Sequence, residues 1–88
     1  MVKYQLIFLS QAQKDAKNLS SSGLKPKALK LLETIQINPL QYPPEYEYLK
    51  GDMQGLISRR INKQHRLVYE VLEESKTIKI YRMWSHYE

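Results

Sequence analysis

Seven ionisable side chains in the second half of this chain could carry chemistry. Arginine offers a planar fork that pairs with a phosphate group at two points. Histidine has an ordinary pKa of about 6.5, which suits proton transfer near neutral pH, and a carboxylate can accept a proton. On composition alone, a solvated sheet face with ordinary ion pairs is the simpler interpretation. The seven residues are Glu47, Lys50, Arg59, Arg60, Arg66, His86 and Tyr87.

Positive charge is distributed unevenly along the chain. The formal net charge is +5, which favours polyanions such as nucleic acid or an acidic segment of a partner protein. Lysines dominate the cations of the first half, whereas all four arginines follow Ser58. Because lysine is a hydrated point charge suited to a solvated helix face, we expect phosphate recognition in the second half.

Several other kinds of site are excluded by the sequence. It contains no Gly-rich phosphate loop, no His and Cys spacing typical of a metal site, and no recognisable Ser, His and Asp arrangement. It also contains no cysteine, which rules out disulfides and thiolate-bound metals. We therefore expect neither a cofactor nor a metal.

The length of the chain fits one domain, residues 1–88. With 42% hydrophobic and 26% charged residues, it leaves no room for a second core, and we expect a partner protein to support so small a fold. No apolar run approaches the ~20 residues that a helix needs to cross a bilayer. We expect a soluble, cytoplasmic protein without membrane contact.

Apolar periodicity predicts a strand and two helices in the first half. Residues 2–9 read as a strand that is partly buried on both sides. A helix is expected to begin at Ser10, because Ser10 and Gln13 have the spacing of a capping box, and to end in the segment 20–23. Pro26 suits the first turn of a second helix, which Asn38 and Pro39 should end. The apolar positions of this helix are Leu24, Ala28, Leu31, Leu32 and Ile35.

The second half predicts a long loop followed by three strands. Prolines, tyrosines and glycines in residues 39–55 favour an ordered loop across one end of the sheet. Strands are expected at 56–61, 66–72 and 77–84, joined by turns at 62–65 and 73–76. The expected fold is α+β, in the order strand, helix, helix, strand, strand, strand. Both N-terminal helices would pack on one face of a mainly antiparallel four-stranded sheet.

Alternation along the strands separates the arginines. Ile57 and Ile61 should face the helices, which places Arg60 on the open face and leaves Arg59 near an edge. In the following strand Arg66 projects to the open face, beside Arg60. Tyr69 and Trp84 are expected in the core or an interface, and His65 in a structural or surface role.

The arginine-rich strand, its successor and the C-terminal pair resemble a known family. The segments are Leu56-Ile57-Ser58-Arg59-Arg60-Ile61, His65-Arg66-Leu67-Val68-Tyr69 and His86-Tyr87, preceded by Glu45-Tyr46-Glu47-Tyr48-Leu49-Lys50 and Gly55. Together they resemble the YoeB branch of the RelE toxin superfamily. The resemblance implies a RelE-like fold and a toxin of a bacterial type II toxin–antitoxin system. It also implies a ribosome-dependent, metal-independent endoribonuclease that cleaves messenger RNA in the ribosomal A site.

The same resemblance implies roles for the ionisable residues. Glu47 would be the general base, Arg66 the phosphate-stabilising cation and His86 the general acid. Glu45 is the alternative base. The residues expected to position RNA are Lys50, Arg60 and Tyr87, and Arg59 would either contact RNA or form a salt bridge.

The implied partners are a YefM-like antitoxin, the ribosome and its message, with a possible homodimer and with DNA contacted only through the antitoxin complex. Two alternatives stay open. The chain could be a non-catalytic ParE-like toxin that inhibits DNA gyrase, or a basic binding module acting in an antitoxin–repressor complex. The trio of Glu47, Arg66 and His86 argues against the gyrase alternative.

Overall fold

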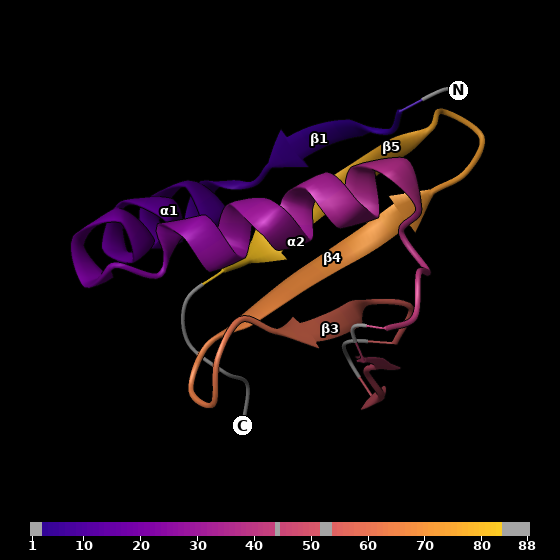
Figure 1. Ribbon diagram of the computed structural model, residues 1–88. Coiled ribbons are helices and arrows are strands. Elements are labelled where there is room, and N and C mark those ends of the chain that lie inside the picture. Colours follow the sequence, from indigo (N-terminus) through magenta and orange to yellow (C-terminus); the bar gives the residue numbers. More distant parts are fainter. Residues whose placement is uncertain (1–2, 44, 52–53, 84–88) are drawn as a thin grey trace.

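Two helices cover one face of a single mixed sheet in the computed structural model, which describes residues 3–43, 45–51 and 54–83 (Figure 1). The helices are α1 (Ser10–Ser22) and α2 (Lys25–Ile37). Strand β1 runs parallel to β5, and the other neighbouring pairs are antiparallel. This confirms the α+β class and the mainly antiparallel sheet. The strands are β1 (Gln5–Phe8), β2 (Tyr46–Tyr48), β3 (Ile57–Arg60), β4 (Arg66–Leu72) and β5 (Thr77–Arg82), in the order β1-β5-β4-β3-β2.

The sheet has five strands rather than the four expected. The additional strand, β2, lies inside the segment 39–55 that the sequence predicts to be a loop. It is only three residues long, too short for alternation to be visible. Its backbone pairs with β3, Glu47 lying opposite Ser58, so pairing between distant segments creates this strand.

The helix boundaries agree with the predicted ones, but the capping box at the first helix is wrong. Leu9 occupies the capping position of α1, where no side-chain cap forms. The Gln13 side chain instead donates a hydrogen bond of 2.9 Å from Nε2 to the Phe8 carbonyl. Gly23 ends the helix with a left-handed φ of 82°, a conformation that favours glycine.

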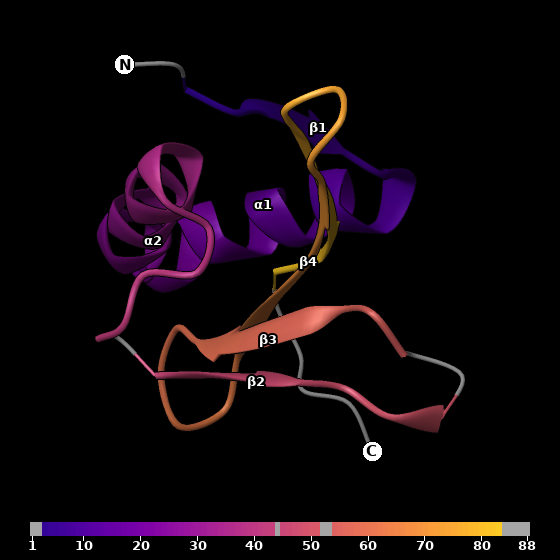
Figure 2. The ribbon, with the colours of Figure 1, turned by 90° about the vertical axis from the view of Figure 1, so that its right-hand side faces the viewer.

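The core lies between the helices and the sheet. The apolar positions predicted for the second helix are buried or packed against it, as are Ile57 and Ile61. Helix α1 contributes Ala12, Ala16 and Leu19. Figure 2 shows that β2 and β3 extend below the layer formed by the helices with β4 and β5. The buried apolar residues are Tyr4, Ala12, Leu19, Ala28, Leu31, Leu32, Ile35, Leu56, Ile57, Ile61, Leu67, Val68, Tyr69, Ile78, Ile80 and Met83.

A buried carboxylate joins α1 to the end of β5. Asp15 is 1% exposed, and its Oδ2 accepts a hydrogen bond of 3.0 Å from the Met83 main-chain N–H. Arg82 forms an ion pair with the same oxygen, at 3.6 Å from Nε. Gln11 donates to the other carboxylate oxygen at 2.9 Å. Burial of a charge requires such partners, so Asp15 holds the described end of the chain against the helix.

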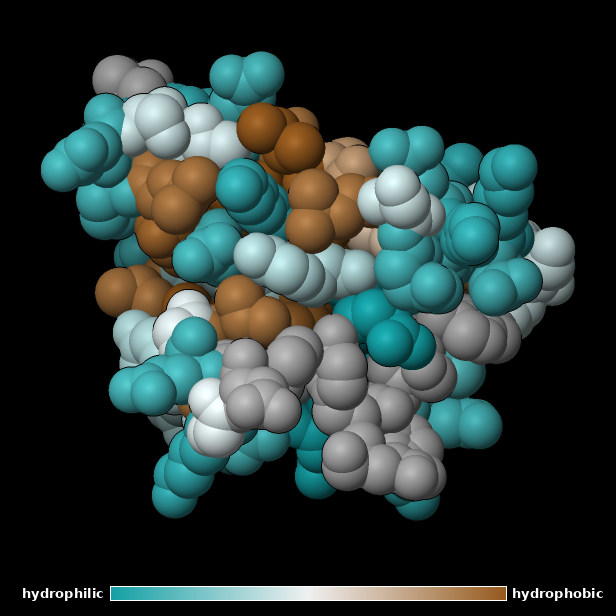
Figure 3. All heavy atoms as spheres, turned by 180° about the vertical axis from the view of Figure 1, so that it is seen from behind, coloured by the Kyte–Doolittle hydropathy of each residue, from teal (hydrophilic) through white to brown (hydrophobic). Residues whose placement is uncertain are grey.

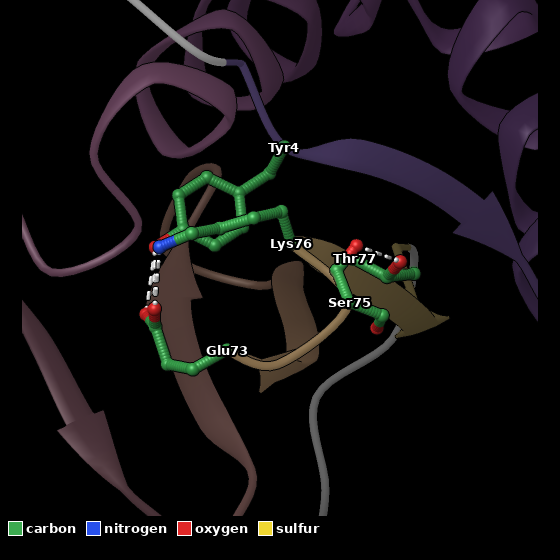
Figure 4. Close-up of polar contacts among 5 residues, drawn as sticks. All are labelled: Tyr4, Glu73, Ser75, Lys76 and Thr77. Atoms are coloured by element: carbon green, nitrogen blue, oxygen red, sulfur yellow. Dashed lines mark hydrogen bonds and ion pairs between the residues drawn. The ribbon is translucent and has the colours of Figure 1, made fainter.

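The chain has a second polar cluster where β1 approaches the β4–β5 turn (Figure 4). The Tyr4 hydroxyl donates to Glu73, 2.6 Å from Oε1, and Lys76 Nζ lies 3.1 Å from Oε2. The Lys76 ammonium also lies 5.2 Å from the centroid of the Tyr4 ring. The Tyr4 hydrogen bond, followed by that from Lys76, lowers the pKa of Glu73 below its ordinary 4.5.

Replacing Tyr4 by phenylalanine is expected to raise the pKa of Glu73 towards its ordinary value. A carboxyl whose pKa is lowered by folding contributes stability above the unfolded pKa, and that contribution is lost as pH falls through the lowered folded value. The Tyr4→Phe variant should therefore lose less stability on acidification than the wild type. The measurement is an NMR titration of the Glu73 carboxyl carbon. Lys76→Gln, which removes the second hydrogen bond and the ammonium charge, should also raise this pKa. A Glu73 titration unchanged in Tyr4→Phe would contradict the assignment.

The surface seen from behind has hydrophobic side chains gathered in its upper and middle part and hydrophilic ones around the rim (Figure 3). In the part of the chain that the structure describes, neither helix has the length or apolar character of a bilayer-spanning helix.

Candidate active site

Three neighbouring strands bring a carboxylate and two arginines to the sheet face opposite the helices. Glu47 on β2 lies across from Ser58 on β3, and Arg60 lies across from Arg66 on β4. Cross-strand partners point to the same face of a sheet, as do residues two apart along one strand. All four side chains therefore share one face, which confirms the expected position of Arg60 beside Arg66.

Glu47 and Arg66 form a direct ion pair. Arg66 Nη1 lies 2.8 Å from Glu47 Oε1, and the same nitrogen donates to Ser58 Oγ at 3.4 Å. The Glu47 side chain is 62% exposed and that of Arg66 26%, so solvent reaches the pair. The ion pair borders a hollow of about 190 Å³ whose lining residues are Glu45, Tyr46, Glu47, Ser58, Arg60 and Arg66.

The remaining expected site residues do not all line this hollow. Lys50 is exposed in the connection between β2 and β3 and lines a separate hollow with Tyr48 and Gln54. His86 and Tyr87, the expected acid and its neighbour, lie outside the described residues, as does Trp84.

Arg59 lies inside the protein, so its expected position near an edge is wrong. It projects to the helix-covered face and is 1% exposed. Its Nη2 donates to the carbonyls of Pro39 and Gln41, at 3.1 and 2.8 Å. The guanidinium carbon also lies 4.8 Å from the centroid of the Tyr46 ring, within cation–π range. These contacts join β3 to the α2–β2 connection and to β2, and they hold Arg59 away from solvent.

Tyr69 completes the network around Arg59. Arg59 Nε donates to the Tyr69 hydroxyl at 2.9 Å, and that hydroxyl donates to the Pro39 carbonyl at 2.7 Å. Burial raises the pKa of Tyr69 above its ordinary value, against the opposing effect of Arg59. The phenol therefore stays protonated at neutral pH, as its donor role requires. The core position expected for Tyr69 is confirmed.

Two lining residues of the hollow were not among the predicted site residues. Alternation places Ser58 on the same face as Arg60, a signal that could have identified it. Tyr46 gave no comparable signal, because recognising its position requires β2. His65 is 7% exposed and its main-chain N–H donates to Asn62 Oδ1 at 2.7 Å, which fits the structural role expected for it.

A second hollow has a different character. About 260 Å³ lies between α1, α2 and the end of β5, lined mainly by apolar side chains such as Phe8, Leu19 and Met83. Its ionisable lining residues are Lys17 and Lys25, so it lacks the carboxylate needed to accept a proton. Among the described residues no three His, Cys, Asp or Glu side chains cluster as metal ligands would.

The fold has close counterparts among solved structures. The YoeB/ParE toxin from Agrobacterium tumefaciens matches with a TM-score of 0.87 at 27% identity, covering 94% of this chain and 99% of that one. The YoeB–YefM complex from Staphylococcus aureus matches with a TM-score of 0.81 at 35% identity, covering 98% and 100%. The YoeB dimer from the same organism matches with a TM-score of 0.83, also at 35% identity and with the same coverage. No curated protein sequence matches the chain.

These similarities define a small α+β toxin with a RelE-like fold. A family model described as the YoeB-like toxin of bacterial type II toxin–antitoxin systems matches residues 8–87. The chain belongs to this family.

Proposed function

We propose that this toxin is a ribosome-dependent endoribonuclease that cleaves messenger RNA in the ribosomal A site. The observation that carries the proposal is the Glu47–Arg66 pair, 2.8 Å apart on an open sheet face beside Arg60. Exposed ion pairs contribute only about 0–1 kcal/mol to stability, so folding gives little reason to place a carboxylate among cations here. A chain with a net charge of +5 is also suited to a polyanionic substrate.

The proposed reaction uses the ribose 2′-hydroxyl as the nucleophile. Glu47 removes its proton while the 2′-oxygen attacks the adjacent phosphorus, and the bond from phosphorus to the 5′-oxygen breaks. His86 supplies the proton that the leaving 5′-oxygen needs. The products are a 2′,3′-cyclic phosphate and a 5′-hydroxyl. The two transfers need a base and an acid on opposite sides of the phosphate, but no metal.

Arg66 stabilises the charge that develops on the phosphoryl oxygens. A guanidinium has five N–H donors, so Arg66 can hold Glu47 and a phosphate oxygen at the same time. Arg60 adds positive charge from the neighbouring strand, while Lys50 and Tyr87 position the RNA. Glu47 is favoured over Glu45 as the base because Glu47 makes the contact with Arg66. Preorganised donors of this kind are commonly the largest single contribution to catalysis.

The proposed partners follow from the family. A YefM-like antitoxin would bind and inhibit the toxin, since a solved relative from Staphylococcus aureus is a YoeB–YefM complex. The same organism's YoeB is also solved as a dimer, so a homodimer belongs to the proposal. DNA would be contacted through the antitoxin, and the toxin would act in the cytoplasm, where ribosomes and messages are found.

The experiment that tests this function is 5′-end mapping of a defined message incubated with ribosomes and the purified toxin. We expect new 5′-hydroxyl ends within the A-site codon, strong dependence on ribosomes, and loss of most cleavage in His86→Gln. Cleavage of free RNA should be poor. Growth arrest with an intact message and with DNA damage that depends on gyrase would instead support the non-catalytic alternative.

A further inference from the structure

A basic groove adjoins the candidate active site on the side of α2. It encloses about 460 Å³ between one face of α2, the α2–β2 connection and the end of β3. Its lining includes three cations, Lys27, Lys30 and Arg60, and no carboxylate. All three side chains are exposed. None of them forms a salt bridge with another described residue, so their charge is not neutralised within that part of the protein.

Arg60 connects this groove to the active site. It lines both the hollow that contains Glu47 and Arg66 and the groove beside α2. An RNA strand whose phosphate backbone leaves the hollow of Glu47 and Arg66 and passes Arg60 would therefore enter the groove next. The three clustered positive charges repel one another, and attraction to a bound polyanion would offset that repulsion.

Arg59 contacts the α2–β2 connection where that connection lines the groove. Gln41 and Pro43 of the connection are lining residues, and the Gln41 carbonyl accepts a hydrogen bond from Arg59. The buried guanidinium thus anchors one segment that lines the groove, while its exposed neighbour Arg60 supplies charge to it.

We propose that Lys27, Lys30 and Arg60 form a second RNA-binding site that holds backbone phosphates of a strand continuing out of the active site. This inference rests on the proposal that RNA is the substrate. Lysine suits such a site because a mobile point charge contacts phosphate without reading sequence. The site therefore contributes affinity and register on the RNA, and Glu47, Arg66 and His86 carry the chemistry.

The test compares two double variants with the same spacing and charge change. Lys27→Gln with Lys30→Gln alters the groove, whereas Lys14→Gln with Lys17→Gln removes two exposed lysines, also three residues apart, from α1. Glutamine and lysine have similar helix propensities, and circular dichroism would verify folding. The probe is a fluorescent oligoribonucleotide carrying 2′-O-methyl groups, which removes the attacking hydroxyl. Anisotropy titrations at several salt concentrations give affinity and its salt dependence.

For single strands, each neutralised phosphate changes the slope of log affinity against log salt by about 0.7. Loss of two contacts should lower the magnitude of the slope by about 1.4 and, near 0.1 M salt, weaken binding roughly 25-fold. The α1 variant should change affinity less than about threefold and keep its slope. Equal losses of affinity in the two double variants would show that only the net charge of the protein matters. That result would overturn the proposal.

A second set of measurements determines which RNA the groove binds. It also distinguishes failure of this inference from failure of the proposed nuclease function. Weaker binding to programmed ribosomes with unchanged oligonucleotide binding would assign the groove to ribosomal RNA and overturn its role on the message strand. Weaker antitoxin binding alone would assign it to an acidic protein segment, with the same consequence. Wild-type toxin that binds the probe through the groove but cleaves no message would overturn the nuclease function and leave the groove standing.

Discussion

Replacing Glu47 by glutamine is expected to reduce message cleavage on ribosomes by about 100- to 10,000-fold, the usual contribution of a general base. Glutamine keeps the size and polarity of the side chain but cannot accept the 2′-hydroxyl proton. Arg66→Ala should reduce cleavage by about 100- to 1,000-fold, because it removes the donor aimed at the phosphoryl oxygens. Single-turnover cleavage rates on saturating programmed ribosomes measure both effects.

The matched control is Glu45→Gln, which neutralises a neighbouring carboxylate lining the same hollow. It should leave the cleavage rate within a few-fold of the wild type. The ion pair is solvent-exposed, so each single replacement should change stability by only about 0–1 kcal/mol, and thermal unfolding would verify this. A large loss of cleavage in Glu45→Gln, with normal cleavage in Glu47→Gln, would assign the general-base role to Glu45 instead of Glu47. Full activity in both Glu47→Gln and Arg66→Ala would exclude the mechanism.

Replacing Arg59 by glutamine is expected to produce the largest loss of stability among single changes near the site. The replacement leaves the Gln41 carbonyl without the donor that it has in the wild type, and it removes a donor from the Tyr69 hydroxyl. Each buried polar group left without its partner costs about 1–3 kcal/mol. We expect a loss of about 3 kcal/mol in the free energy of unfolding, which corresponds to a fall in Tm of roughly 12–24 °C for a domain of this size.

Arg60→Gln is the control for this prediction, because the same change occurs one residue further along on an exposed side chain. It should alter the free energy of unfolding by less than about 0.5 kcal/mol. Arg59→Lys keeps the charge but loses the planar fork, and should fall between the wild type and Arg59→Gln. If Arg59→Gln does not fold, Arg59→Lys still provides the measurement. Equal stability of the Arg59 and Arg60 variants in urea unfolding would contradict the structural role.

The burial of Arg59 is where sequence reasoning failed most clearly. Alternation assigned Arg59 and Arg60 to opposite faces, and this is what the sheet has. Sequence reasoning nevertheless placed Arg59 near an edge, because the partners that a buried arginine needs lie far away along the chain. Its partners are the carbonyls of Pro39 and Gln41 and the hydroxyl of Tyr69. No local pattern in the sequence indicates that three such groups meet.

The elements whose signals are local could be predicted without the structure. Periodic apolar residues and the glycine and proline boundaries set both helices, and alternation set the faces of β3 and β4, because each depends on neighbours within a few residues. The residues of the carboxylate–arginine site could also be named from the sequence, through the resemblance to the family.

The way in which distant segments combine is visible only in the folded chain. Strand β2 exists because it pairs with β3, and this pairing brings Glu47 to 2.8 Å from Arg66, nineteen positions along the chain. The packing of α2 beside the end of β3 places Lys27 and Lys30 along the same groove as Arg60, a neighbourhood that the charge pattern of the sequence does not indicate. Contacts of this kind depend on the whole chain closing around one core, and so they leave no trace in local periodicity.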